Sequence, residues 1–216
     1  MSEVLDADAR GVDAVIAAGQ RLARDFDLPI SSFFFLRHGR TSSNHLGIIQ
    51  GQKDVPLDAV GRAQARAAAE RLAETGIRPQ RIVSSDLSRA AETARILAHH
   101  LSMRVEDYDS DLRERHFGEL QGTGTQGHDV RQRMWQETPP GAESIEDFVA
   151  RCAAALQRQL VEPGTLIVAH GGVLRALAAL LLQPVTKEAR ANAVPLTIAR
   201  RDERAGSSWR IELISP

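Results

Sequence analysis

The sequence predicts a three-layer α/β/α fold, in which a mostly parallel sheet is covered by helices on both faces. Short apolar runs of strand length occur at 32–36, 81–83 and 165–169. Continuous runs of this kind are typical of strands that are buried on both faces. Longer segments with apolar residues at helical spacing separate these runs, and strands that alternate with helices favour a parallel sheet. The end of the chain adds an antiparallel hairpin to this prediction.

Each element has its own pattern. Residues 3–27 show helical spacing, and Pro29 closes the segment. We therefore expect an N-terminal helical extension over 1–29 and a single domain over 30–216, because no linker, repeat or low-complexity tract divides the latter. Further helices are predicted over 58–75, 87–101, 130–136, 143–161 and 172–182. Further strands are predicted over 103–108, 197–201 and 209–214, the last two forming the hairpin around Gly206.

Composition excludes several classes of protein. The 216 residues include 27 basic and 28 acidic ones, a formal net charge of -1, whereas nucleic-acid and anionic-membrane proteins usually carry a basic excess. The longest apolar stretch, 173–182, is too short for a membrane span of about 20 residues. The single cysteine, Cys152, rules out an internal disulfide, and the first residues lack a signal-peptide pattern. We therefore expect a cytoplasmic protein.

Polar residues follow three of the predicted strands, at 37–39, 84–86 and 170–172. Ligands of open α/β sheets bind at the carboxyl ends of the strands, so neighbouring strands would bring Arg37, His38, Arg89 and His170 together. Arginines can neutralise phosphoryl oxygens, and a neutral imidazole can attack phosphorus. Backbone N–H groups at the start of the helix after His170 would also favour an anion. These residues predict a phosphoryl site.

Five blocks of sequence resemble the histidine phosphatase superfamily, in its phosphoglycerate-mutase-like branch. The first block contains Arg37-His38-Gly39, and the last contains His170-Gly171-Gly172. In chain order, the blocks are 36–44, 84–94, 112–122, 140–144 and 168–172. The resemblance implies a phosphoglycerate-mutase-like fold for the domain that begins at residue 30.

The resemblance also implies roles for individual residues. His38 matches the nucleophile that becomes a phosphohistidine, and Glu114 matches the proton donor to the leaving group, which later activates water. Arg37, Arg89 and His170 match the remainder of the phosphate pocket. The substrate-binding residues implied are Thr41, Asn44, Gln50, Gly51, Arg115, His116 and Gly171. No metal or other cofactor is expected, because the arginines and His170 supply the charge stabilisation.

The physical chemistry of these residues agrees with those roles. Nearby positive groups should keep the His38 imidazole neutral and therefore nucleophilic. A dianionic substrate beside Glu114 should favour the protonated carboxyl that a proton donor needs. Glu119 is a second carboxylate within reach of the same loop and remains an alternative. HExxH, paired CxxC and GxSxG motifs do not occur, which disfavours a metal hydrolase or a serine hydrolase.

Within this family the sequence favours a phosphatase over a mutase. The segment 114–118 resembles the mutase ERHYG motif, but the lysine that follows in mutases is missing from 120–125. The long mutase insertion is also missing, since Pro140 lies only 18 positions after Gly122. We therefore expect hydrolysis of a small phosphorylated metabolite. A phosphoglycerate mutase, and a non-catalytic regulator that binds a phosphorylated ligand, remain the alternatives.

Two further expectations concern specificity and assembly. Candidate specificity residues on the pocket rim are Arg40, Arg115, His128, Arg131, Arg133 and Trp135. The N-terminal extension packs on the domain or on a partner, so a homodimer is possible.

Overall fold

The described residues contain one mixed sheet of six strands in the order β3-β2-β4-β1-β5-β6. The structure is a computed structural model that describes residues 9–126, 128–200 and 209–215. The parallel strands are β3 (Asp107–Tyr108), β2 (Arg81–Ser84), β4 (Thr165–Ala169) and β1 (Ser32–Arg37). Strand β5 (Pro195–Arg200) is antiparallel to β1, and β6 (Trp209–Leu213) is antiparallel to β5. The predicted fold class is confirmed, while the turn around Gly206 lies outside the described residues.

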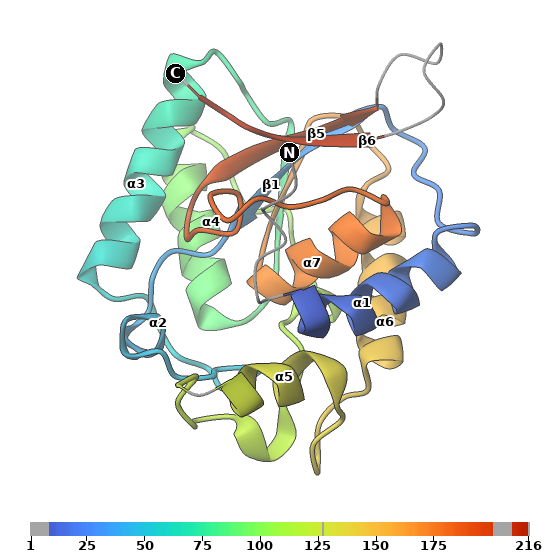
Figure 1. Cartoon of the computed structure of the whole chain (residues 1–216). Coiled ribbons are helices and arrows are strands. Elements are labelled where there is room, and N and C mark those ends of the chain that lie inside the picture. The colour runs from blue at the N-terminus through green and yellow to red at the C-terminus, as the bar shows by residue number, and fades with distance from the viewer. Residues whose placement is uncertain (1–8, 127, 201–208, 216) are drawn as a thin grey trace, which may run out of the picture.

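Helices cover both faces of this sheet (Figure 1). Helices α3 (Ala59–Glu74) and α4 (Ser88–His100) lie on one face, and α1 (Ala9–Leu22), α6 (Ile145–Gln159) and α7 (Gly171–Leu180) lie on the other. Phe33 and Phe35 of β1 belong to the core under α1, α6 and α7, whereas Leu36 belongs to the core under α3 and α4. This division explains why the central strands are apolar at consecutive positions. In the described part of the chain, no helix is long and apolar enough to cross a membrane.

The boundaries of the helices follow from their caps. Asp58 accepts a hydrogen bond from Gly61 N (2.7 Å) before α3, as its position predicts. Ser144 accepts one from Asp147 N (3.0 Å), so α6 begins later than predicted. Two further helices are α2 (Ser42–Leu46), which sequence reasoning missed, and α5 (His128–Gln136), which begins two residues earlier than predicted. Two short 3-10 helices, η1 (Ser110–Leu112) and η2 (Gly118–Leu120), precede α5.

Helix α1 packs against α5, α6 and α7. Val15 and Ala18 are buried in the larger core cluster. Gly19 allows a close approach to α7, because a Cβ at this position would lie 2.4 Å from the Ala179 Cβ. The helix ends at Leu22, earlier than predicted, and residues 1–8 lie outside the described part. The N-terminal segment therefore contributes directly to the core of the domain.

Candidate active site

The strand register brings the predicted residues to one edge of the sheet. Strands β2, β4 and β1 are neighbours, with Ser84 paired to Val168 and Arg37 paired to Ala169. His38 continues the β1 ladder, and its backbone N donates to Ala169 O (2.9 Å). The residues that follow these three parallel strands therefore emerge together at their carboxyl ends, as the sequence predicts.

His38 is buried and held in one tautomer. Its Nδ1 lies 2.7 Å from Gly39 O, and because a carbonyl oxygen only accepts, the proton sits on Nδ1. The Nε2 atom therefore carries the lone pair. Burial lowers the pKa of His38 well below its ordinary value of 6.5, and the positive charges of Arg89 and Arg37 lower it further. Both effects favour a neutral imidazole with its lone pair on Nε2, which is the form that nucleophilic attack requires.

Arg89 enters the site from the first turn of α4 and is almost completely buried. Its Nη1 and Nη2 donate to Lys53 O (2.9 Å) and Gly51 O (2.7 Å). Burial is the largest cause that lowers its pKa to about 10. Arg37 is tied to the chain by one bond, from Nη1 to Arg190 O (2.7 Å). Both guanidinium groups are positioned by backbone oxygens that leave part of their donor capacity unused.

His170 is the second buried histidine of the site. Its Nε2 lies 2.9 Å from Ser85 Oγ, and its ring centroid lies 5.1 Å from that of His38. Burial lowers its pKa well below 6.5, and Arg89 adds to this effect. Among the described residues, three buried nitrogens have no hydrogen-bond partner: Arg37 Nε, Arg89 Nε and His170 Nδ1. Buried polar atoms rarely remain unpaired, so these three fit an anion bound beside His38.

Arg37, His38 and Arg89 line a cavity of about 210 Å³, whereas His170, a predicted catalytic residue, is not part of its lining. The sequence-predicted residues that line it are Arg37, His38, Asn44, Gln50, Gly51, Arg89, Glu114, Trp135 and Gly171. Gly172, at the helix start that the sequence predicted to favour an anion, lines it as well. Sequence reasoning missed the rest of the lining, which is Ile48, Ile49, Phe117, Thr125, Met134, Arg175 and Arg190. The cavity lining therefore combines arginine side chains with apolar and aromatic ones.

Glu114 faces this cavity from the loop between η1 and η2. Its Oε2 accepts a hydrogen bond from Gly172 N (3.0 Å), and its Oε1 accepts one from Arg115 N (2.9 Å). The alternative carboxylate, Glu119, does not line the cavity and pairs with Arg133 (2.7 Å) in an exposed position. Of the two carboxylates, Glu114 is therefore the one that faces the cavity.

Three predicted substrate contacts do not line the cavity. Arg115 is completely buried instead of lying on the rim, and its guanidinium donates to the carbonyls of Met134, Glu137 and Glu143. Thr41 is also completely buried, as the N-cap of α2.

His116 is turned toward its own loop, where Nδ1 accepts from Gly118 N (3.1 Å) and Nε2 lies 3.1 Å from Gln121 Nε2. Of the other rim candidates, Arg40 pairs with Asp58 (2.8 Å) and Arg133 with Glu119, while the side chains of His128 and Arg131 lie outside the described part.

Asn192 is a site residue that sequence reasoning missed. Its Nδ2 donates to His38 O (2.8 Å). Ala193 N donates to Arg37 O (2.9 Å), which fixes the same segment to the end of β1. Because β5 is antiparallel to β1, its amino end meets the carboxyl end of β1. The signal in the sequence that could have identified Asn192 is that it is a polar residue shortly before a strand.

The fold and the pocket define a class of α/β proteins whose arginine-lined cavity lies at the carboxyl edge of a mixed sheet. The chain belongs to branch 1 of the histidine phosphatase superfamily, whose family model matches residues 33–215.

Named relatives include both phosphatases and mutase-like proteins. The chain is 39% identical over 168 residues to glucosyl-3-phosphoglycerate phosphatase of Mycobacterium tuberculosis, covering 68% of this chain and 74% of the relative. It is 37% identical over 164 residues to phosphoglycerate mutase-like protein 4 of Arabidopsis thaliana, covering 70% and 71%. A solved structure of mycobacterial glucosyl-3-phosphoglycerate phosphatase in complex with VO3 matches with a TM-score of 0.67 and 33% identity, covering 85% of this chain and 98% of that one.

Proposed function

We propose that this protein is a metal-independent phosphomonoesterase that hydrolyses a small phosphorylated metabolite through a phosphohistidine on His38. The observation that carries the proposal is the contact between His38 Nδ1 and Gly39 O (2.7 Å), because it leaves Nε2 unprotonated beside two arginines. Arg37, Arg89 and His170 supply charge stabilisation, so the proposed reaction requires no metal. The single, buried Cys152 supports a reducing compartment such as the cytoplasm.

The first half of the proposed reaction transfers the phosphoryl group to the protein. Nε2 of His38 attacks phosphorus, and the bond between phosphorus and the ester oxygen breaks. Glu114, in its protonated form, gives its proton to the leaving oxygen, so the product alcohol departs neutral. Arg37 and Arg89 stabilise the negative charge on the equatorial phosphoryl oxygens.

The second half regenerates the enzyme. Water attacks the phosphorus of phosphohistidine, the carboxylate of Glu114 takes a proton from that water, and the bond between phosphorus and Nε2 breaks. Inorganic phosphate then leaves, with His38 neutral and Glu114 protonated again. The same carboxyl group serves as acid in one half and as base in the other.

Two observations support hydrolysis over phosphoryl transfer between substrate positions. In its described residues, the segment between η2 and α6 contains one helix, α5, and its length leaves no room for the long insertion of mutases. The lysine expected of a mutase is missing from 120–125. The similarity to mutase-like relatives keeps phosphoglycerate mutase as the second candidate.

Phosphate release tests this proposal. Wild type and His38→Ala are compared on p-nitrophenyl phosphate and a panel of small phosphorylated metabolites, with EDTA present. We expect His38→Ala to lose about 10³-fold or more of the turnover, as the loss of a nucleophile does. His100→Ala, an exposed histidine of α4, is the matched control and should keep wild-type rates.

Two outcomes contradict the proposal. Full activity in His38→Ala would contradict the assignment of the nucleophile. Conversion of 3-phosphoglycerate to 2-phosphoglycerate without phosphate release would establish the mutase instead.

A further inference from the structure

The loop that carries Glu114 has no regular secondary structure between η1, which ends at Leu112, and η2, which begins at Gly118. A group that must reach a leaving oxygen within about 2.6–3.2 Å cannot be left to such a loop alone. A displacement of about 1 Å can cost 10²-fold in rate. The contacts that fix the backbone on either side of Glu114 are therefore part of how the site works.

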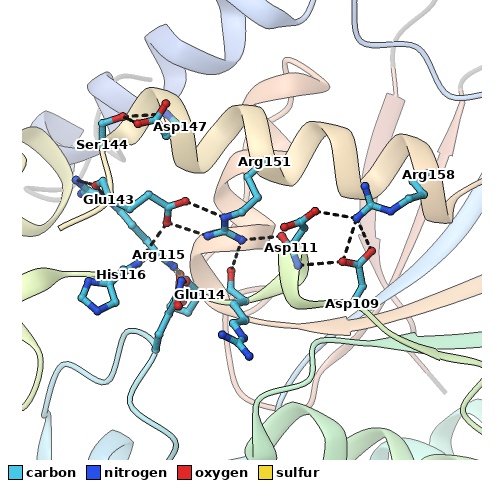
Figure 2. Close-up of polar contacts among 12 residues, drawn as sticks. Asp109, Asp111, Glu114, Arg115, His116, Glu143, Ser144, Asp147, Arg151 and Arg158 are labelled. Atoms are coloured by element: carbon cyan, nitrogen blue, oxygen red, sulfur yellow. Dashed lines mark hydrogen bonds and ion pairs between the residues drawn. The ribbon is translucent and has the colours of Figure 1, made fainter. Parts of the chain in front are cut away.

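Arg151, on α6, fixes the side that precedes Glu114 (Figure 2). Its Nη1 donates to Arg113 O (3.1 Å) and to Asp111 O (2.7 Å). Arg113 O belongs to the peptide group that joins Arg113 to Glu114. The guanidinium thus holds the chain immediately before the carboxylate.

Glu143 fixes the side that follows Glu114. Its Oε2 accepts a hydrogen bond from His116 N (3.3 Å), and its own carbonyl accepts two from the buried Arg115 guanidinium (2.9 and 2.7 Å). The carboxylate also forms a two-pronged ion pair with Arg151, with both N–O distances at 2.8 Å. The side chains of Arg151 and Glu143 are only 18% and 16% exposed, so water screens this pair weakly.

From these contacts we propose that the Arg151–Glu143 pair positions Glu114 for proton transfer to the leaving group. The pair does not line the cavity, and it acts through the backbone of residues 113–116. This inference rests on the proposed function, since it assigns a task to the proposed proton donor. Loss of this positioning should slow only esters whose leaving oxygen is poorly stabilised as an anion, because only these esters need the proton from Glu114.

Arg158 provides a matched control on the same helix. It lies two turns after Arg151 and pairs with Asp109 (2.8 Å) and Asp111 (3.0 Å), also before the Glu114 loop (Figure 2). In the described part of the chain, Arg158 makes no hydrogen bond or ion pair with residues 113–116, so it stabilises the neighbouring segment without holding the backbone next to Glu114. Replacing it removes two ion pairs to the neighbouring segment and tests whether general loosening of that segment is enough.

The test compares kcat/KM for two esters in Arg151→Met, Arg158→Met and Glu114→Gln. Glycerol 1-phosphate releases an alkoxide that needs a proton, whereas p-nitrophenyl phosphate releases a stable phenolate. The ratio kcat/KM reports the steps up to phosphoryl transfer to His38, so it isolates the acid role. We expect Arg151→Met to lose about 10²-fold on glycerol 1-phosphate and less than about fivefold on p-nitrophenyl phosphate. Glu114→Gln should show the same selective pattern, and Arg158→Met should change both esters equally.

Equal losses on both esters in Arg151→Met would overturn the positioning role. If Arg151→Met does not fold, Arg151→Lys replaces it, because lysine keeps one donor for Glu143. The same two esters are then compared in Arg151→Lys. If wild type released no phosphate, or if His38→Ala released it as fast as wild type, the proposed function itself would be contradicted. Failure of the positioning role and failure of the proposed function therefore give different results.

Discussion

A single contact decides the chemistry available to His38. The Gly39 carbonyl, 2.7 Å from Nδ1, selects the tautomer in which Nε2 is free. Gly39 itself must be glycine, because a Cβ there would lie 2.4 Å from Gly61 O. Burial is the largest cause of the lowered pKa of His38, and it favours the neutral ring. Sequence reasoning attributed this neutrality to nearby positive groups alone; the direction was right, but desolvation dominates.

The two buried histidines predict how stability depends on pH. The pKa values of His38 and His170 are well below 6.5 in the folded protein, so below that pH the unfolded chain binds more protons. Stability from these groups is fully present above about pH 6.5 and falls as the pH drops, by up to about 1.4 kcal/mol per pH unit for each histidine. Urea unfolding near pH 7.5 and near pH 5.5 measures the loss. It should be smaller in His170→Gln; an unchanged loss in that variant would contradict this origin.

The first turn of α7 is the element on which the site converges. Gly172 N donates to Glu114 Oε2, and a Cβ on Gly172 would lie 1.9 Å from Glu114 Oε1 and 2.9 Å from Trp135 Cη2. The absence of a side chain here lets the carboxylate, the indole and the helix N-terminus meet. The space at Gly172 is therefore a requirement of the site.

Gly172→Ala should separate activity from stability. Alanine favours the helix by up to about 1 kcal/mol, and the added Cβ displaces the end of the flexible Glu114 side chain and the edge of the Trp135 ring. We expect thermal stability within about 1 kcal/mol of wild type and kcat/KM on glycerol 1-phosphate reduced about 10²-fold. Gly124→Ala, whose Cβ would meet only Gln126 N at 4.0 Å, is the control for a glycine replacement near the pocket. Wild-type activity in Gly172→Ala would contradict this reading of the site.

How well each element could be predicted depended on its contacts. Strand β4 is buried throughout and β1 is buried or half-buried, so their apolar runs indicated that both strands exist. That they are neighbours was an assumption of the predicted site, because an apolar run does not specify its partner. Strand β3 is only two residues long, and α2 is one turn held by the capping box of Thr41 and Asn44, so neither has a periodic pattern to detect. Residues before β5, such as Asn192, reach the site through antiparallel pairing that the sequence alone does not specify.

On the scale of the whole molecule, α1 lies before the part matched by the family model, residues 33–215, yet completes one side of the core. It contacts α5, which carries the cavity residues Met134 and Trp135, and α7, which carries Gly171 and Gly172. The apolar stripe of this segment was readable from the sequence, but its partner was not, because packing on the domain and packing on a second copy leave the same pattern.

Gly19→Leu tests the contribution of α1. A side chain at Gly19 collides with the backbone and Cβ of Ala179, and overpacking of this kind typically costs about 1–3 kcal/mol. For a protein of this size we expect the melting temperature to fall by about 2–4 °C for each kcal/mol lost. Gln20→Leu, at the exposed neighbouring position, should leave the melting temperature within about 1–2 °C of wild type. Equal melting temperatures for Gly19→Leu and wild type would mean that α1 does not brace α7.

The central claim is a covalent phosphoryl group on His38, and trapping that intermediate tests it most directly. Wild type and Glu114→Gln are mixed with p-nitrophenyl phosphate, quenched in alkali, where phosphohistidine survives, and analysed by peptide mass spectrometry. We predict one added phosphoryl group on the peptide that contains His38, with greater accumulation in Glu114→Gln because water activation is impaired. Phosphate release at the normal rate with no phosphoryl group on His38, or with the group on His170 instead, would contradict the account.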